Sequence, residues 1–149
     1  MNSENIPNIK SGIYNKGDVS LEELISSVKN GANISKAGAI LVFNGIVRES
    51  SNTGNAIETL TIDAYDELAN RTMERICNDL KQKKGIIDLR IIHLKGKFQI
   101  SEDLVYVIVA SAHREEGFKT LREAVERYKK EIEVWKQEEF LNGNSKWIH

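Results

Sequence analysis

Apolar residues along the chain gather in short runs of the length and pattern typical of strands. Residues 38–47 (GAILVFNGIV) and 104–110 (LVYVIVA) are almost continuously apolar and rich in β-branched side chains, which indicates buried strands. Residues 57–65 and 86–93 predict two further strands. Residues 95–97 (KGK) are expected to form the turn that follows the strand at 86–93.

Two helices are expected between these strands. After a short first strand at residues 9–14, Ser20 and Glu23 have the spacing of a capping box, which starts a helix that runs to Val28. A second helix is predicted over residues 66–81. Its inward side is expected to carry Leu68, Thr72, Ile76 and Leu80.

The last third of the chain predicts a longer helix whose end has two interpretations. Read as a helix, residues 111–138 place one apolar stripe at alternating steps of three and four: Phe118, Leu121, Val125, Tyr128, Ile132 and Trp135. However, residues 132–137 alternate and include β-branched side chains, so the helix could instead end near Lys130 and be followed by a strand. The sequence leaves both interpretations open.

This order of elements predicts an α+β fold with a largely antiparallel sheet. At 149 residues and 40% hydrophobic content, the chain has the size of a single domain with one core, and residues 1–7 form a loose lead-in. No apolar run has the length of a membrane span, and the N-terminus does not resemble a signal peptide, so a cytoplasmic location is expected. The polar residues 49–56 form either a plain connector, which is favoured, or a lid.

Most familiar chemical motifs are missing, and a group of cations remains. The chain has no P-loop, GxGxxG, CxxC or HExxH motif, and His93, His113 and His149 are too scattered to indicate a metal site. The cations at the ends of predicted core elements are Arg48, His113, Arg114, Lys129 and Lys136. Any one of these lysines is best explained as a surface charge, but together they indicate an anion-binding pocket with a candidate catalytic lysine.

The motifs that hold these cations are similar to those of a known family. They are F-x-G-x-V-R at residues 43–48, S-A-H-R-x-x-G-F at 111–118, and Lys129 followed by W-K-x-E at 135–138. In this order, over about residues 38–147, they resemble the large, catalytic subunit of molybdopterin synthase.

The resemblance implies a fold, an assembly and a reaction. The fold is of the α/β hammerhead type, and the protein forms a central homodimer within a heterotetramer, with a small ubiquitin-like sulfur carrier at each end. The carrier's C-terminal Gly-Gly thiocarboxylate enters a pocket on the large subunit. There sulfur is transferred twice to cyclic pyranopterin monophosphate, which gives the dithiolene of molybdopterin. The resemblance implies no metal and no cofactor for this step.

Site residues follow from the matched motif positions. The resemblance implies that Lys129 is the catalytic lysine and Lys136 the second active-site lysine. Arg48, His113 and Arg114 are implied to bind the phosphate of the substrate, with contributions from both subunits of the dimer, and Phe43 to form a pocket wall. A lysine beside the attacked carbon activates the sulfur nucleophile or stabilises the anionic intermediate.

The chain departs from the family's pattern at a few positions. Glu133 stands where the family usually has a proline, which affects the expected boundary between helix and strand. Leu94 replaces an arginine that follows the histidine of the family's middle strand, and whether the adjacent Lys95 substitutes for it is open. Lys146 either adds to the pocket or only packs the tail.

Two other functions fit these residues less well than sulfur transfer. A non-catalytic, dimeric docking module for a ubiquitin-like protein or a phosphorylated small molecule would not need two converging lysines. Nucleic-acid binding is disfavoured because the aromatic residues lie on the predicted core stripe and the formal net charge is −1.

Overall fold

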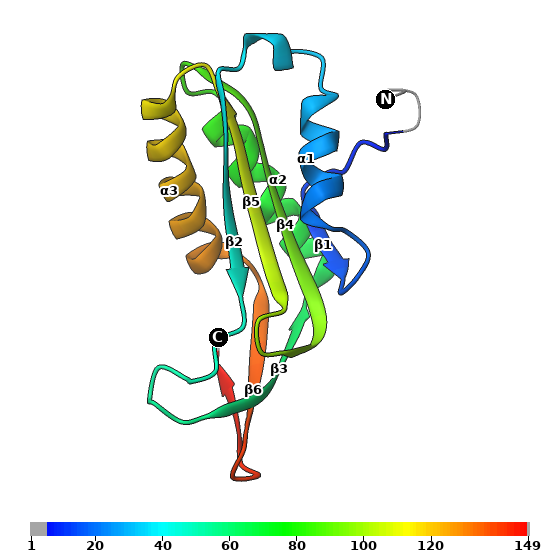
Figure 1. Ribbon diagram of the computed structural model, residues 1–149, viewed down its shortest axis with the longest axis vertical. Coiled ribbons are helices and arrows are strands. Elements are labelled where there is room, and N and C mark those ends of the chain that lie inside the picture. Colours follow the sequence, from blue (N-terminus) through cyan, green and yellow to red (C-terminus); the bar gives the residue numbers. More distant parts are fainter. Residues whose placement is uncertain (1–5, 149) are drawn as a thin grey trace.

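The computed structural model describes residues 6–148, which form three α-helices and a seven-stranded sheet (Figure 1). The helices are α1 (Leu21–Lys29), α2 (Asp66–Lys81) and α3 (Arg114–Glu131), with a short 3-10 helix, η2, at Ile34–Lys36. The strands are β1 (Gly12–Asn15), β2 (Ala39–Ile46), β3 (Ile57–Ala64), β4 (Ile86–Gln99), β5 (Asp103–Ser111), β6 (Val134–Phe140) and β7 (Ser145–Ile148). Most of the expected N-terminal lead-in, residues 1–5, and His149 lie outside the described residues.

The long strand β4 joins two parts of the sheet. Its residues 86–93 pair with β5, residues 92–95 pair in parallel with β1, and its last residues, 96–99, pair with β3. From β3 the sheet continues to β6 and β7, which lie below the rest in Figure 1. All strand pairings of the described residues other than β1–β4 are antiparallel. This confirms the predicted α+β, α/β hammerhead-type fold with a largely antiparallel sheet.

The turn predicted at residues 95–97 is wrong, because these residues continue β4. Gly96 has a backbone φ of +135°, a conformation that favours glycine, and it pairs with Ile62 of β3. The chain turns instead at residues 100–101, directly after β4. A local K-G-K pattern does not reveal the pairing with a distant strand that keeps this segment extended.

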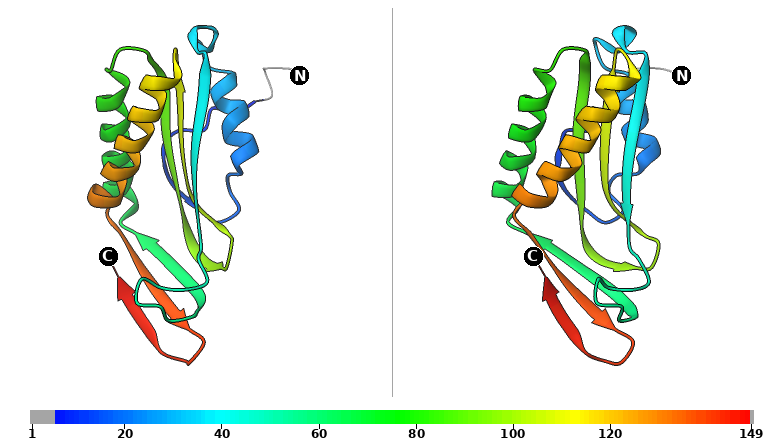
Figure 2. Two further views of the ribbon diagram at one scale, coloured as in Figure 1. Left: turned by 60° about the vertical axis from the view of Figure 1, so that its left-hand side comes forward. Right: turned by 90° about the vertical axis from the view of Figure 1, so that its left-hand side faces the viewer.

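Helices cover both faces of the upper sheet. Figure 2 shows α2 and α3 side by side on one face and α1 on the other. Each residue of Leu104–Ala110 in β5 is buried, which explains why this strand has an unbroken apolar sequence. The core therefore has two layers, with β5 and the first half of β4 at its centre.

The predicted inward faces of α2 and α3 are partly wrong. Leu68 and Phe118 are 49% and 62% exposed. The buried residues of α2 are Ala69, Thr72, Met73, Ile76, Cys77 and Leu80, and those of α3 are Gly117, Thr120, Ala124 and Tyr128. The small ones among them, such as Ala69, Gly117 and Ala124, let a helix lie close to a sheet, so the buried face does not follow the largest apolar residues alone.

The second interpretation of the C-terminal region is confirmed: α3 ends at Glu131, and β6 follows. Glu133, in the position of the family's usual proline, anchors this junction to α2. The Thr72 hydroxyl donates one hydrogen bond that the two carboxylate oxygens share, at 2.6 and 2.9 Å. The Glu133 backbone carbonyl accepts a bond of 3.1 Å from the Tyr65 N–H. The junction is therefore held by hydrogen bonds rather than by the ring of a proline.

Candidate functional site

A cavity of about 560 Å³ lies where the two parts of the sheet meet the end of α3. Phe43, Arg48, Lys129 and Lys136 line it, so four of the six predicted site residues come together there. The remaining lining residues include Asn44, Gly45, Ser50, Asn52, Leu60, His93, Val105, Tyr128, Glu138 and Ile148.

The end of β2 supplies one wall. A Cβ added to Gly45 would lie 2.6 Å from Val105 Cγ1, so only glycine allows β2 to lie this close to the β5 side chain. The register of β2 against β5 shifts directly after this glycine. Beyond the strand, the exposed Arg48 donates a hydrogen bond of 2.6 Å from Nη2 to Asn52 Oδ1. The F-x-G-x-V-R motif thus forms this wall of the cavity, and Arg48 lies at the end of the wall.

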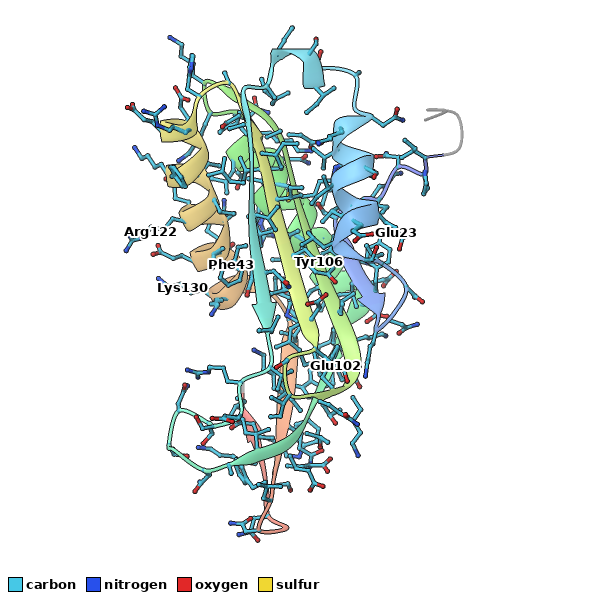
Figure 3. All side chains as sticks on the ribbon, in the orientation of Figure 1. Glu23, Phe43, Glu102, Tyr106, Arg122 and Lys130 are labelled. Carbon is cyan, nitrogen blue, oxygen red and sulfur yellow. The ribbon has the colours of Figure 1, made fainter. Side chains whose placement is uncertain are left out.

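The last turn of α3 supplies the opposite wall. Lys129 is exposed, and its Nζ lies 6.0 Å from the centre of the Phe43 ring. The neighbouring Tyr128 is buried edge-on between Phe43 and His93, with ring centroids 6.4 and 5.9 Å apart. Burial raises the pKa of Tyr128 to about 12, so its phenol stays neutral. Figure 3 shows Phe43 between β2 and α3, and Lys130 projecting from α3 away from the sheet.

Strand β6 places Lys136 inside the cavity. It pairs with Ile62 of β3 on one side and Ile148 of β7 on the other, which fixes its position. Burial lowers the pKa of Lys136, and the positive charge of Lys129 lowers it further, while Glu138 acts in the opposite direction. Lys136 therefore releases a proton more readily than an exposed lysine.

Besides Tyr128, two buried titratable residues of the cavity were not among the predicted site residues. His93 on β4 is 4% exposed and Glu138 on β6 is 8% exposed. Burial, aided by the charge of Lys136, lowers the pKa of His93 to about 4, so the imidazole is neutral near pH 7. Two features of the sequence could have indicated these residues. His93 lies inside an apolar strand, and Glu138 is the last residue of the W-K-x-E motif.

The polar loop after β2 takes part in the cavity wall through Ser50 and Asn52. Ser51 is 8% exposed and accepts hydrogen bonds of 3.3 and 3.2 Å from the Thr53 and Asn55 N–H groups. The loop thus has its own hydrogen-bonded core. The prediction of a plain connector is therefore incomplete, because the loop also lines the cavity.

His113 and Arg114 do not line this cavity. They are the N-cap and first residue of α3, and both are exposed. Arg114 is separated from Lys129 by about 22 Å along the helix. One copy of the chain therefore does not bring His113 and Arg114 to the cavity that Arg48 lines, although all three were predicted to bind the same phosphate.

Lys95 and Lys146 also lie outside the cavity lining. Lys95 forms an ion pair of 2.7 Å with Asp66 at the start of α2, and Lys146 is exposed on β7. In the described part of the chain, no three His, Cys, Asp or Glu side chains are grouped so as to hold a metal ion. No helix among residues 6–148 is long and apolar enough to cross a membrane.

Comparison with known proteins finds relatives of one family. The family model of the MoaE protein matches residues 15–131. The molybdopterin synthase catalytic subunit of Pyricularia oryzae is 40% identical over 112 residues, which cover 75% of this chain and 61% of that protein. The subunit of the same name from Pyrococcus abyssi is 37% identical over 131 residues, which cover 88% of this chain and 84% of that protein.

Solved structures agree in fold. Molybdopterin synthase from Staphylococcus aureus superposes with a TM-score of 0.80 at 29% identity, covering 93% of this chain and 96% of that one. A chain from the complex of subunits 1 and 2 of the molybdopterin-converting factor of Helicobacter pylori superposes with a TM-score of 0.71 at 25% identity, covering 93% and 88%. The chain therefore belongs to the MoaE protein family, whose curated relatives are catalytic subunits of molybdopterin synthase, an enzyme of sulfur transfer.

Proposed function

We propose that this chain is the catalytic subunit of a molybdopterin synthase and that its reaction takes place in the cavity between β2, α3 and β6. The substrate is cyclic pyranopterin monophosphate, and the sulfur comes from the C-terminal thiocarboxylate of a small ubiquitin-like carrier. The observation that carries the proposal is the convergence of Arg48, Lys129 and Lys136, from three separate segments, on one cavity.

The charges of the cavity suit two anionic reactants. The guanidinium of Arg48 offers paired donors to the phosphate. Lys129, at the exposed edge beside Phe43, attracts the thiocarboxylate and stabilises negative charge that develops at the attacked carbon. Lys136, with its lowered pKa, exchanges a proton with the reacting groups more readily than an ordinary lysine. A pure docking module does not need a lysine whose pKa is lowered.

His113 and Arg114 enter the proposal through a second copy of the chain. Both are exposed and lie far along α3 from Lys129, so we place them in the phosphate site of the partner subunit in a homodimer. The carrier would complete a heterotetramer. The Helicobacter pylori relative, whose structure is a complex of two subunits, supports a small partner. A cytoplasmic location stays a prediction from the sequence.

Mixed dimers test this arrangement. Lys129→Ala and Arg114→Ala homodimers are each expected to be inactive when supplied with the substrate and thiocarboxylated carrier. In a mixed dimer of the two variants, one of the two sites regains both an intact Lys129 and an intact Arg114 if these residues come from different subunits. Random mixing then restores about a quarter of wild-type activity. No recovery in dimers shown to have exchanged subunits would contradict the shared site.

A further inference from the structure

The buried imidazole of His93 lines the same cavity and has no role in the chemistry proposed above. Its Nδ1 lies 3.0 Å from the backbone carbonyl oxygen of Leu94. A carbonyl oxygen only accepts hydrogen bonds, so Nδ1 carries the proton in the neutral ring. The other ring nitrogen, Nε2, is therefore an unprotonated acceptor.

Nε2 is unpaired and reaches open space. Within residues 6–148 it forms no hydrogen bond, because the Nδ1 contact is the one hydrogen bond of the His93 side chain. Among the described residues, two side-chain polar atoms have no partner and no accessible surface: Thr59 Oγ1 and Glu116 Oε2. His93 Nε2 is not one of these two, so this unpaired atom has some accessible surface. Since the ring is 4% exposed and lines the cavity, the space that Nε2 reaches is the cavity.

The neutral ring differs in chemistry from the cations beside it. Lys129, Lys136 and Arg48 donate hydrogen bonds and attract anions, whereas His93 Nε2 offers a lone pair without a charge. Its nearest aromatic partner, Tyr128, holds the ring edge-on at 5.9 Å. The pKa of His93, about 4, keeps the imidazole neutral near pH 7. The position suits an uncharged N–H or O–H donor.

We propose that His93 Nε2 binds the substrate by accepting a hydrogen bond from a neutral N–H or O–H group of its pterin ring system, and so sets the orientation in which the substrate enters. The inference rests on the proposed function. Arg48 is exposed and His93 is buried, so a substrate with its phosphate at Arg48 extends its ring toward His93. A molecule without a donor at that end leaves a buried acceptor unpaired and binds less tightly.

Nitrogen NMR of the histidine side chains tests the proposal in the wild-type protein. Cyclic pyranopterin monophosphate is added without the carrier, so that no sulfur is transferred. We expect Nε2 of His93 to resonate as an unprotonated nitrogen between about pH 6 and 8, and to move on binding in the direction of a hydrogen-bonded nitrogen. Binding that changes other signals and leaves Nε2 unmoved overturns the role of His93 but not the proposed function. No binding at all overturns both.

Two variants separate substrate binding from a structural role. His93→Gln retains a polar group near the position of Nε2, whereas His93→Leu removes it. In steady-state assays with carrier, we expect the leucine variant to raise KM about tenfold with a smaller change in kcat, and the glutamine variant to recover most of the loss. Melting temperatures show whether each variant is folded. An unchanged KM in folded His93→Leu, or equal KM values in the two variants, would overturn the proposal.

Discussion

Lys129 and Lys136 line one cavity from two different elements, although only six residues separate them in the chain. The helix α3 ends two residues after Lys129, and β6 begins two residues before Lys136, so the chain reverses from helix to strand between the two lysines. The charge of Lys129 thereby lowers the pKa of Lys136. Had the helix continued, both lysines would lie on one helix edge, with no wall opposite them.

Replacing Lys136 is expected to abolish activity without weakening the fold. Its lowered pKa means that the folded protein disfavours the charged amine, so Lys136→Met removes an unfavourable, partly buried charge. We expect turnover to fall by about a hundredfold or more, and the urea midpoint to equal or exceed that of the wild type.

Lys146→Met is the matched control for this variant. Lys146 is an exposed lysine on the neighbouring strand β7, outside the cavity lining, and its replacement is expected to leave turnover unchanged. If Lys136→Met keeps normal turnover, or if Lys146→Met loses it, the assignment of the second lysine is wrong.

The buried His93 is expected to make stability depend on pH. Its pKa is about 4 in the folded protein and about 6.5 in the unfolded chain, so the unfolded state binds more protons between these values. Stability is therefore lost as the pH falls from about 6.5 to 4, by up to about 3 kcal/mol.

Urea titrations at pH 7 and pH 5 measure this effect. Because carboxylates also titrate in this range, the informative quantity is the difference between the wild type and His93→Gln, which has no imidazole to protonate. We expect the wild type to lose more stability than the variant between the two pH values. Equal losses would show that His93 is not held neutral by the fold.

The hydrogen bonds of Glu133 are expected to stabilise the junction between α3 and β6. Glu133→Ala removes the acceptor of the Thr72 hydroxyl, on a residue that is 4% exposed, and should cost about 1–2 kcal/mol in the free energy of unfolding. Glu133→Gln keeps an acceptor and should lose less. A full loss in the glutamine variant would show that the negative charge, rather than the hydrogen bond, is what matters there.

Local signals predicted much of the secondary structure. The capping box at the start of α1 forms as expected, with Ser20 and Glu23 each accepting the other's backbone N–H, and α2 has the predicted bounds. These features depend on residues close together in sequence. The extent of β4 was missed because Gly96 is kept extended by β3, a strand that precedes it by more than thirty residues.

In the site, too, features that depend on residues close in sequence could be predicted, and features that depend on distant residues could not. Motif positions identified Phe43, Arg48, Lys129 and Lys136, and the fold brings these together. His93 could not be assigned from the sequence, since its contact with Tyr128 depends on α3 packing against the sheet. The separation of Arg114 from Lys129 follows from the predicted helix, but the sequence does not show that the cavity lies at the Lys129 end of that helix.

The most direct test of the proposed function is the conversion of cyclic pyranopterin monophosphate to molybdopterin with thiocarboxylated carrier, comparing Lys129→Ala with Lys130→Ala. Both lysines are exposed in the last turn of α3, but only Lys129 lines the cavity. We expect the wild type and Lys130→Ala to form product at similar rates and Lys129→Ala to form almost none. Full turnover by Lys129→Ala, or none by the wild type with its carrier bound, would contradict the proposed function.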